Sequence, residues 1–323
     1  MKTGSGTTGD EPGRGIPATI NLCLAAFHAA LNLYQFLFLP LWLLPADRAW
    51  AWTLLPLALL NNPFWSLIHE AIHDLFHPNR SSNALFGRLL AILFGSPFQI
   101  LRLSHLLHHK LNRTPAEGTE FFDRGKSSKA AAAPGYYLQI LGGLYLVEVF
   151  SPLAFFLPRS WIKRFKERSL AAQSVSAILV QNWLRDETLR EIRIDGLWTV
   201  GWLSLGFYCY GEHWPLLVAV LAARGLLISF LDNIYHYQTP VSDIFYAKNL
   251  ALPRLAEMLL LHFNLHGIHH VNPAIPWIGL PRVFHAQAGR FQGRYFSAAL
   301  YQLRGPIALQ DLPDGRRPDV GSA

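Results

Sequence analysis

Histidines gather in three clusters along this chain, and the members of each cluster are mostly three or four residues apart. The clusters are His69, His73 and His77; His105, His108 and His109; and His266, His269 and His270. Residues three and four apart lie on one face of a helix. Imidazoles packed side by side would repel one another if charged, and would need donors for their lone pairs if neutral. Coordination to a cation removes both difficulties, so the clusters predict metal ligands.

The number of imidazoles predicts two metal ions, each with about four or five protein ligands. His236, which follows a long apolar segment, is a further candidate ligand. Imidazole suits iron, zinc and copper alike, so the spacing leaves the metal open. Isolated histidines are usually packed as ordinary core residues. We assign that role to His28, His213, His262 and His285.

Two other metal chemistries fit the pattern less well. The segment from His69 to His73, with Glu70 between them, matches the HExxH pattern of zinc proteases. Such a site needs only about three protein ligands and a water, which would leave the other two clusters without a purpose. Haem takes single axial histidines that face each other, and closely spaced triplets do not match that arrangement.

The composition indicates a membrane protein. Of the 323 residues, 51% are hydrophobic and 15% are charged, whereas soluble domains carry about 25% charged residues. The net charge of +7 comes from basic residues that flank apolar segments, as the cytoplasmic loops of membrane proteins do. This placement favours membrane topology over binding of nucleic acid. The two cysteines lie in apolar runs, so no disulfide framework is expected.

Two pairs of apolar segments predict transmembrane hairpins, since one span needs about 20 residues. The first pair covers residues 16–44 and 49–68, and the second covers residues 197–210 and 215–235. Residues 79–102 predict an amphipathic or partly re-entrant helix on the membrane. Between the hairpins, the pattern predicts an exposed loop over 111–133, a re-entrant hairpin or a surface helix over 136–157, and an amphipathic helix over 169–195.

We therefore predict an all-α integral membrane protein with two transmembrane hairpins (about four spans), interfacial helices and a cytosolic, histidine-rich cap for two metal ions. Both hairpins return to the side of the N-terminus, which places the histidine clusters on one face of the bilayer. Residues 1–15 and 304–323 are expected to be disordered tails around a membrane domain of residues 16–303. The expected location is a bacterial inner membrane, with the clusters facing the cytoplasm.

The order of the clusters resembles a known family. The patterns HxxxH, HxxHH and a distant HxxHH each follow a membrane segment, and the similarity runs from about residue 61 to residue 284. The third cluster is followed by Pro273, Pro276 and Trp277 and then by Leu280 and Pro281. This run is similar to the one that follows the last histidine box in the membrane fatty acid desaturase superfamily. An asparagine shortly after the second box, Asn112, is a weaker match.

The resemblance implies a non-haem di-iron centre that uses dioxygen and two electrons to remove hydrogen from an unactivated C–H bond. It implies nine ligands, which are His69, His73, His105, His108, His109, His236, His266, His269 and His270. It also implies supporting roles, as an extra ligand or as a hydrogen-bond partner of the ligands, for His77, Asn233, Glu70, Asp74 and Asn112. A histidine at position 77 is more similar to the carotenoid hydroxylase branch and to some bacterial desaturases.

The function that we expect is an O2-dependent lipid oxidase, most simply a fatty acid (acyl-lipid) desaturase. A carotenoid hydroxylase or ketolase with the same chemistry is the alternative, and a membrane zinc protease or a non-catalytic metal transporter is a distant one. The sequence has no four-cysteine iron–sulfur pattern, so a separate ferredoxin-like or cytochrome-like protein is expected to supply electrons. The basic run over residues 159–168 is a candidate docking surface for it, although membrane topology explains the same run. Lipid and membrane are the other expected partners.

Overall fold

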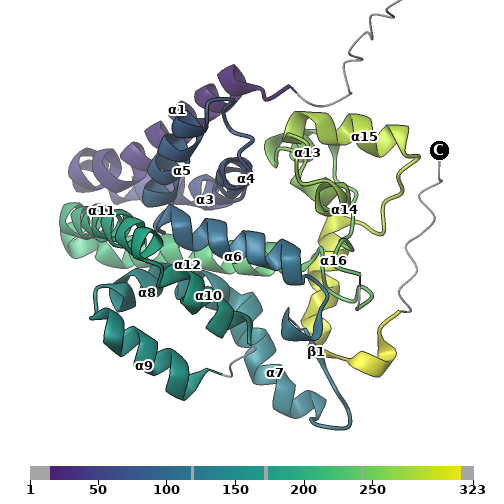
Figure 1. Ribbon diagram of the computed structural model, residues 1–323. Coiled ribbons are helices and arrows are strands. Elements are labelled where there is room, and N and C mark those ends of the chain that lie inside the picture. Colours follow the sequence, from purple (N-terminus) through teal and green to yellow (C-terminus); the bar gives the residue numbers. More distant parts are fainter. Residues whose placement is uncertain (1–14, 118–119, 171–173, 242, 314–323) are drawn as a thin grey trace, which may run out of the picture.

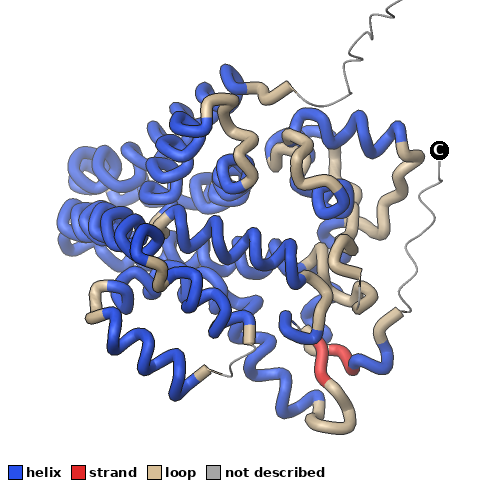
Figure 2. Tube along the Cα trace, viewed as in Figure 1, coloured by secondary structure: helices blue, strands red, loops and turns tan. Residues whose placement is uncertain are grey.

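The structure is a computed structural model that describes residues 15–117, 120–170, 174–241 and 243–313. Regular structure in these residues is almost entirely helical, and one short strand pair lies near the lower right edge of the molecule (Figure 2). The pair joins β1 (Phe121–Phe122) to β2 (Ile307–Ala308) in parallel. The prediction of a mainly helical protein is confirmed.

Among the described residues, two helical runs are long and apolar enough to cross a membrane, Ala18–Ala46 and Asp186–Asn233. The first run comprises α1 (Ala18–Leu33), the π-helix η1 (Tyr34–Leu43) and α2 (Leu44–Ala46). A third span is reached if the bent pair α5 (Arg80–Phe94) and α6 (Phe98–Leu111) counts as one. The apolar helices therefore fit a membrane protein, while the count of four spans stays a prediction.

The predicted second arm of the first hairpin, residues 49–68, is divided into short helices. They are the 3-10 helix η2 (Arg48–Thr53), α3 (Leu54–Leu59) and α4 (Asn61–Ile72). Pro63 has no N–H to donate to the carbonyl of Leu59, which weakens a helix at this point. The side chain of Asn61 donates to the carbonyls of Leu57 and Ala58 at 3.1 and 3.0 Å. This break precedes the last turn of α4, which contains His69 and is directly followed by His73.

The second hairpin consists of α11 (Asp186–Tyr210), the 3-10 turn η5 (Gly211–His213) and α12 (Trp214–Asn233). A Cβ atom at Gly206 would lie 3.4 Å from Cδ2 of Leu217. Eleven residues of straight helix would span about 16 Å, so the chain must reverse between these two positions. The reversal uses Gly211, whose φ of 49° favours glycine. The helix predicted for 169–195 is divided between α10 (Val175–Trp183) and the start of α11.

A bend of 101° separates α5 from α6. Gly95 ends α5 in a left-handed conformation with a φ of 103°. Arg224 of α12 is buried beside this end, and its guanidinium donates to the carbonyl of Phe94 at 2.5 Å and to the side-chain oxygen of Asn61 at 2.7 Å. The bend directs α6, with the second histidine cluster, across the middle of the molecule toward α14 (Figure 1).

Residues 136–157, for which the sequence left two structures open, belong to a kinked helical run. It contains α7 (Lys129–Leu138), the π-helix η4 (Gln139–Gly143) and α8 (Leu144–Phe155). The kink falls at Leu141 and Gly142, and Gly142 lies against the backbone of Gly225 in α12. The basic helix α9 (Arg159–Ser169) follows and lies at the lower edge of Figure 1.

The prediction of an exposed loop over residues 111–133 is wrong for its first half. Arg113 and Glu120 are both buried and form an ion pair. The guanidinium of Arg113 also donates to the carbonyls of Thr239 and Pro240, at 2.6 and 3.0 Å. The segment after α6, including the 3-10 turn η3 (Pro115–Glu117), is therefore anchored to the chain that follows His236.

The last part of the chain returns to the histidine clusters and then to β1. Its elements are α13 (Arg254–Leu259), η6 (Phe263–Leu265), α14 (His266–Val271), η7 (Trp277–Gly279), α15 (Leu280–Ala286), α16 (Tyr295–Tyr301), η8 (Gln302–Arg304), β2 and η9 (Leu309–Asp311). The start of the predicted C-terminal tail is structured, since it holds β2 and since Gly305 accepts a hydrogen bond of 2.7 Å from the hydroxyl of Tyr237. Residues 1–14 and 314–323 of the predicted tails lie outside the described residues.

Candidate metal centre

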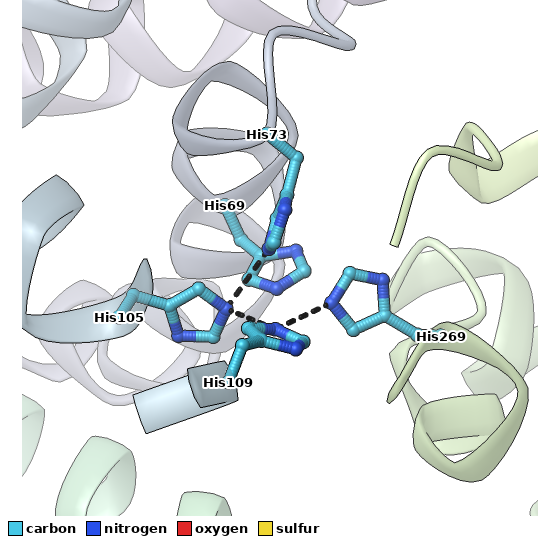
Figure 3. Close-up of side chains that lie close together, drawn as sticks. All are labelled: His69, His73, His105, His109 and His269. Carbon is cyan, nitrogen blue, oxygen red and sulfur yellow. Dashed lines mark hydrogen bonds between the residues drawn. The ribbon is translucent and has the colours of Figure 1, made fainter. Parts of the chain in front are cut away.

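The nine histidines predicted as ligands meet in two groups. The five-histidine group contains His69, His73, His105, His109 and His269, and the four-histidine group contains His108, His236, His266 and His270. Within each group, one ring nitrogen from every member lies within 4.8 Å of those of all the others. In the five-histidine group the rings come from α4, α6 and α14 and point toward one another (Figure 3). Segments up to about 200 residues apart in the sequence therefore converge on one place.

Each HxxHH cluster supplies both groups, because neighbouring residues on a helix point about 100° apart. In α6, His105 and His109 belong to the five-histidine group and His108 to the four-histidine group. In α14, His269 belongs to the five-histidine group, whereas His266 and His270 belong to the other. The rings of His109 and His270 stack at a centroid distance of 4.3 Å, so the two groups are in direct contact.

The nitrogen positions in the five-histidine group fit a shared cation. The Nε2 atom of His105 lies 3.0 Å from Nε2 of both His73 and His109, and Nε2 of His109 lies 3.1 Å from Nε2 of His269. A neutral Nε2 carries either one proton or one lone pair, so these contacts cannot all be ordinary hydrogen bonds between independent pairs. Ligand nitrogens about 2.1 Å from a metal and at right angles are about 3.0 Å apart. Nε2 of His69 is buried and has no hydrogen-bond partner among the residues that the structure describes, which the same cation would explain.

The four-histidine group has a comparable arrangement and an acidic neighbour. Nε2 of His266 lies 3.1 Å from Nε2 of His270, and the ring of His236 lies 4.6 Å from that of His108. On the outer side of His108, Nδ1 lies 2.6 Å from a carboxylate oxygen of Glu117. A carboxylate that accepts from one ring nitrogen of histidine orients the other toward a metal.

Sequence reasoning missed Glu117. A carboxylate near a ligand histidine is a general expectation, but the residue lies nine positions after His108 in a short 3-10 turn. No periodic pattern connects the two positions, because the path of the intervening chain decides whether they meet. Arg113 and Glu120 lie on either side of this turn and form a buried ion pair. The ion pair holds the two ends of the turn in place.

Of the two asparagines predicted to support the ligands, one contacts the four-histidine group and the other bonds to a distant segment. The side-chain nitrogen of Asn112 lies 3.3 Å from Nδ1 of His270 and donates to the carbonyls of Ile244 and Tyr246 at 2.8 and 3.0 Å. The side-chain nitrogen of Asn233 donates to the side-chain oxygen of Gln302 at 2.8 Å. Asn112 is thus in contact with the four-histidine group, whereas the bond of Asn233 points to the segment after α16.

The remaining three predicted residues lie outside both groups. Nδ1 of His77 accepts a hydrogen bond from the backbone of Asn79 at 3.0 Å. The carboxylate of Asp74 pairs with Arg102 at 2.8 Å. Glu70 accepts from the backbone N–H of Trp277 at 3.1 Å, and its burial raises the pKa of its carboxyl to about 8 although this bond lowers it. Their roles as partners of ligand histidines stay predictions.

The protonation state of the third cluster suits metal binding. His266, His269 and His270 are all buried. Burial, and then repulsion from neighbouring histidines, holds the pKa of each of these imidazoles well below its usual range. At neutral pH the three rings are therefore uncharged, and each keeps one lone pair available for a cation.

Comparison with known proteins gives two matches. The family model described as "Fatty acid desaturase" matches residues 48–299 of this chain. The chain is also similar to "Omega-6 fatty acid desaturase, chloroplastic" of Spinacia oleracea, with 22% identity over 255 residues. That alignment covers 76% of this chain and 54% of the relative, so the chain spans about half the length of the curated protein that it matches. The region that the family model matches contains the three histidine clusters.

Proposed function

Because the chain belongs to the fatty acid desaturase family, we propose that it is an oxidoreductase, an O2-dependent di-iron desaturase that introduces a double bond into the acyl chain of a lipid. The observation that carries the proposal is the sorting of nine histidines into groups of five and four. Each group would hold one ion. Because the two groups are in contact, both ions could act on the same substrate.

The residues of the two groups would act as neutral ligands. Imidazole alone does not select the metal, so the choice of iron rests on family membership. Bound iron would supply the oxidising chemistry, in which dioxygen, two electrons and two protons take two hydrogens from neighbouring carbons of the chain and form two water molecules. The protein would hold the rings in place through Glu117 at His108 and Asn112 at His270. Burial of His69, His266, His269 and His270 would limit the access of water.

The membrane context supports a lipid substrate. Two helical runs are apolar enough to cross a bilayer, and α4 and α12 end close to histidines of the two groups. Acyl chains dissolved in the bilayer would thus reach the site without crossing water. A separate ferredoxin-like or cytochrome-like protein would supply the electrons, and an inner membrane with the histidines facing the cytoplasm is the location we propose.

The carotenoid hydroxylase alternative gains no support from the geometry. Its particular likeness was a histidine at position 77, and His77 lies outside both groups, bonded to Asn79. The zinc protease alternative used His69, Glu70 and His73, but the first and third of these share a group with three further histidines. We therefore propose desaturation alone.

Lipid profiling tests the proposal. The chain is expressed with a ferredoxin-type donor and its reductase, and the acyl chains of the host are analysed by mass spectrometry. We expect products lighter by two hydrogens with the wild type, and none with His269→Ala. His285→Ala is the matched control, because His285 is exposed and lies outside both groups. An acyl profile that stays unchanged with iron-loaded wild type and a working donor would contradict desaturation, and oxygenated products would indicate hydroxylation instead.

A further inference from the structure

A cavity of about 650 Å³ lies beside the strand pair, away from the histidine rings. The segment from Phe122 to Lys129 forms one side of it and the segment from Tyr301 to Asp311 forms the other. Tyr237, which directly follows His236 of the four-histidine group, lines the cavity and donates its hydroxyl to the carbonyl of Gly305 at 2.7 Å. One residue that lines the cavity is therefore the direct neighbour in sequence of a candidate metal ligand.

Cations dominate the lining of this cavity. Arg124, Lys129 and Arg304 line it, and Asp311 is the acidic residue that lines it with them. Arg124 forms an ion pair with Asp311. Arg304 lies over the ring of Tyr301 at 4.1 Å, and among the described residues neither Arg304 nor Lys129 forms an ion pair with a carboxylate. Two positive charges therefore remain for an anionic ligand.

Two features next to these charges favour an oxyanion. Lys129 is the first residue of α7, so the N–H groups of the first turn lie at the same rim, and Ser128 caps only the N–H of Ala131, at 3.2 Å. Backbone N–H groups at a helix N-terminus that lack partners in the helix bind phosphate well. Lys129 and Arg304 supply charge-assisted hydrogen bonds to the same kind of group. The chemistry of the cavity is that of a phosphate site.

An exposed apolar surface adjoins the cavity. Phe296, Leu300 and Leu303 follow one another at helical spacing along α16 and η8, with 67%, 69% and 45% of their surface exposed. Leu138 at the end of α7 is 68% exposed, and the hydroxyl of Tyr137 donates to the carbonyl of Leu303 at 2.8 Å, so the two segments are side by side. A cationic cavity bordered by exposed apolar side chains suits a molecule with an anionic head and apolar chains.

We propose that this cavity binds the phosphate-bearing headgroup of a membrane glycerolipid and so holds the polar end of the lipid on the side of the molecule where Tyr237 follows His236. The inference rests on the proposed function and narrows its substrate class to an anionic phospholipid. Lys129 and Arg304 bind the phosphate, and the apolar stripe of α16 lies along the chains. A cationic site of this kind would discriminate against uncharged glycolipids.

Binding of short-chain lipids to the detergent-solubilised, iron-loaded full chain tests the site without turnover. The probes for calorimetry are dihexanoyl phosphatidylglycerol, an uncharged galactolipid of the same chain length, and inorganic phosphate. The test variant is Lys129→Gln with Arg304→Gln. The matched control is Arg185→Gln with Arg190→Gln, just before and within the start of α11, which removes the same charge from exposed positions outside the cavity. Iron content and melting temperature verify that each variant is folded, and Lys129→Gln alone serves if the double variant is not.

We expect the test variant to bind phosphatidylglycerol at least about tenfold more weakly than the wild type, with the control variant unchanged.

Equal weakening in both variants would show general charge attraction and overturn the site. Equal affinity of the galactolipid would overturn the phosphate assignment, and inorganic phosphate that binds as tightly as the lipid would assign a free-anion site instead. Wild type that binds the lipid but desaturates none would contradict the proposed function alone. Undiminished desaturation of phosphatidylglycerol by the test variant would contradict the headgroup site alone.

Discussion

His108 and His109 are neighbours in the sequence, yet their rings belong to different groups of candidate metal ligands. Their ring centroids are 5.8 Å apart, and His269 and His270 repeat the arrangement at 6.0 Å. A pair of adjacent histidines on one helix therefore joins the two groups. This arrangement fixes the groups relative to each other, because adjacent positions on a helix hold their side chains about 100° apart.

Replacing one member of such a pair should affect one iron only. We expect His108→Ala to weaken iron binding at the four-histidine group and His109→Ala to weaken it at the five-histidine group. The loss should be larger for His108→Ala, since three imidazoles remain there instead of four. Iron analysis with Mössbauer spectroscopy of ⁵⁷Fe-loaded protein distinguishes the two sites. Loss of the same spectral component in both variants would contradict the assignment of the groups, and His285→Ala should match the wild type.

Glu117 should matter through His108. In Glu117→Gln the amide can no longer offer a charged acceptor to Nδ1 of His108, now 2.6 Å from the carboxylate. We expect iron affinity at the four-histidine group to fall about 10- to 100-fold and the five-histidine group to keep its iron. Chelator competition measures both affinities. Glu167→Gln, on the surface of α9, is the control, and an unchanged affinity in Glu117→Gln would show that the contact does not support the ligand.

Arg224 should stabilise the bend that directs α6 to the site. Its guanidinium donates to Phe94 and Asn61, and lies 5.1 Å from the ring centroid of Phe94. Arg224→Ala removes these bonds and leaves a cavity, so we expect a loss of about 2–4 kcal/mol in the free energy of unfolding. Thermal unfolding followed by circular dichroism checks this. The exposed Arg190→Ala should have little effect, and equal melting temperatures for both variants would contradict the role of Arg224.

Replacement by alanine should change the free energy of unfolding differently at two glycines of α11. A Cβ at Gly206 would lie 2.9 Å from Cε1 of Phe36, whereas one at Gly201 would meet nothing within 4 Å. We expect Gly206→Ala to destabilise by about 1–3 kcal/mol through overpacking. Gly201→Ala should be neutral or should stabilise by up to about 1 kcal/mol, because alanine favours helix. Melting temperatures of the two variants decide, and a stabilised Gly206→Ala would contradict the close contact of α11 with η1.

Periodicity identified the histidines that meet in the two groups, but it did not predict how the groups share them. The steps of three and four residues identified the clusters at His69, His105 and His266, and the general context added His236. Sorting into groups of five and four depends on the directions in which α4, α6 and α14 approach one another. The 101° bend before α6 sets one of these directions, and a bend of that size at Gly95 has no signature in hydropathy.

Polar contacts between distant segments explain the remaining differences. The polar composition of residues 111–133 predicted exposure, but Arg113 is buried because Glu120 and the carbonyls of Thr239 and Pro240 all bind its guanidinium. The division of residues 54–72 into two helices could have been predicted from the sequence, because Pro63 lacks a backbone donor. Composition detects apolar runs, whereas the partners of a single buried charge depend on the tertiary fold.

The number and identity of the metal ions in purified, active protein test the account most directly. Elemental analysis of the wild type, prepared in detergent without added metal, gives the ratio of iron and zinc to protein. The two histidine groups predict two metal ions per chain, and membership of the desaturase family predicts that both are iron, with little zinc bound. A single zinc ion per chain, held by the HExxH segment from His69 to His73, would contradict the di-iron centre.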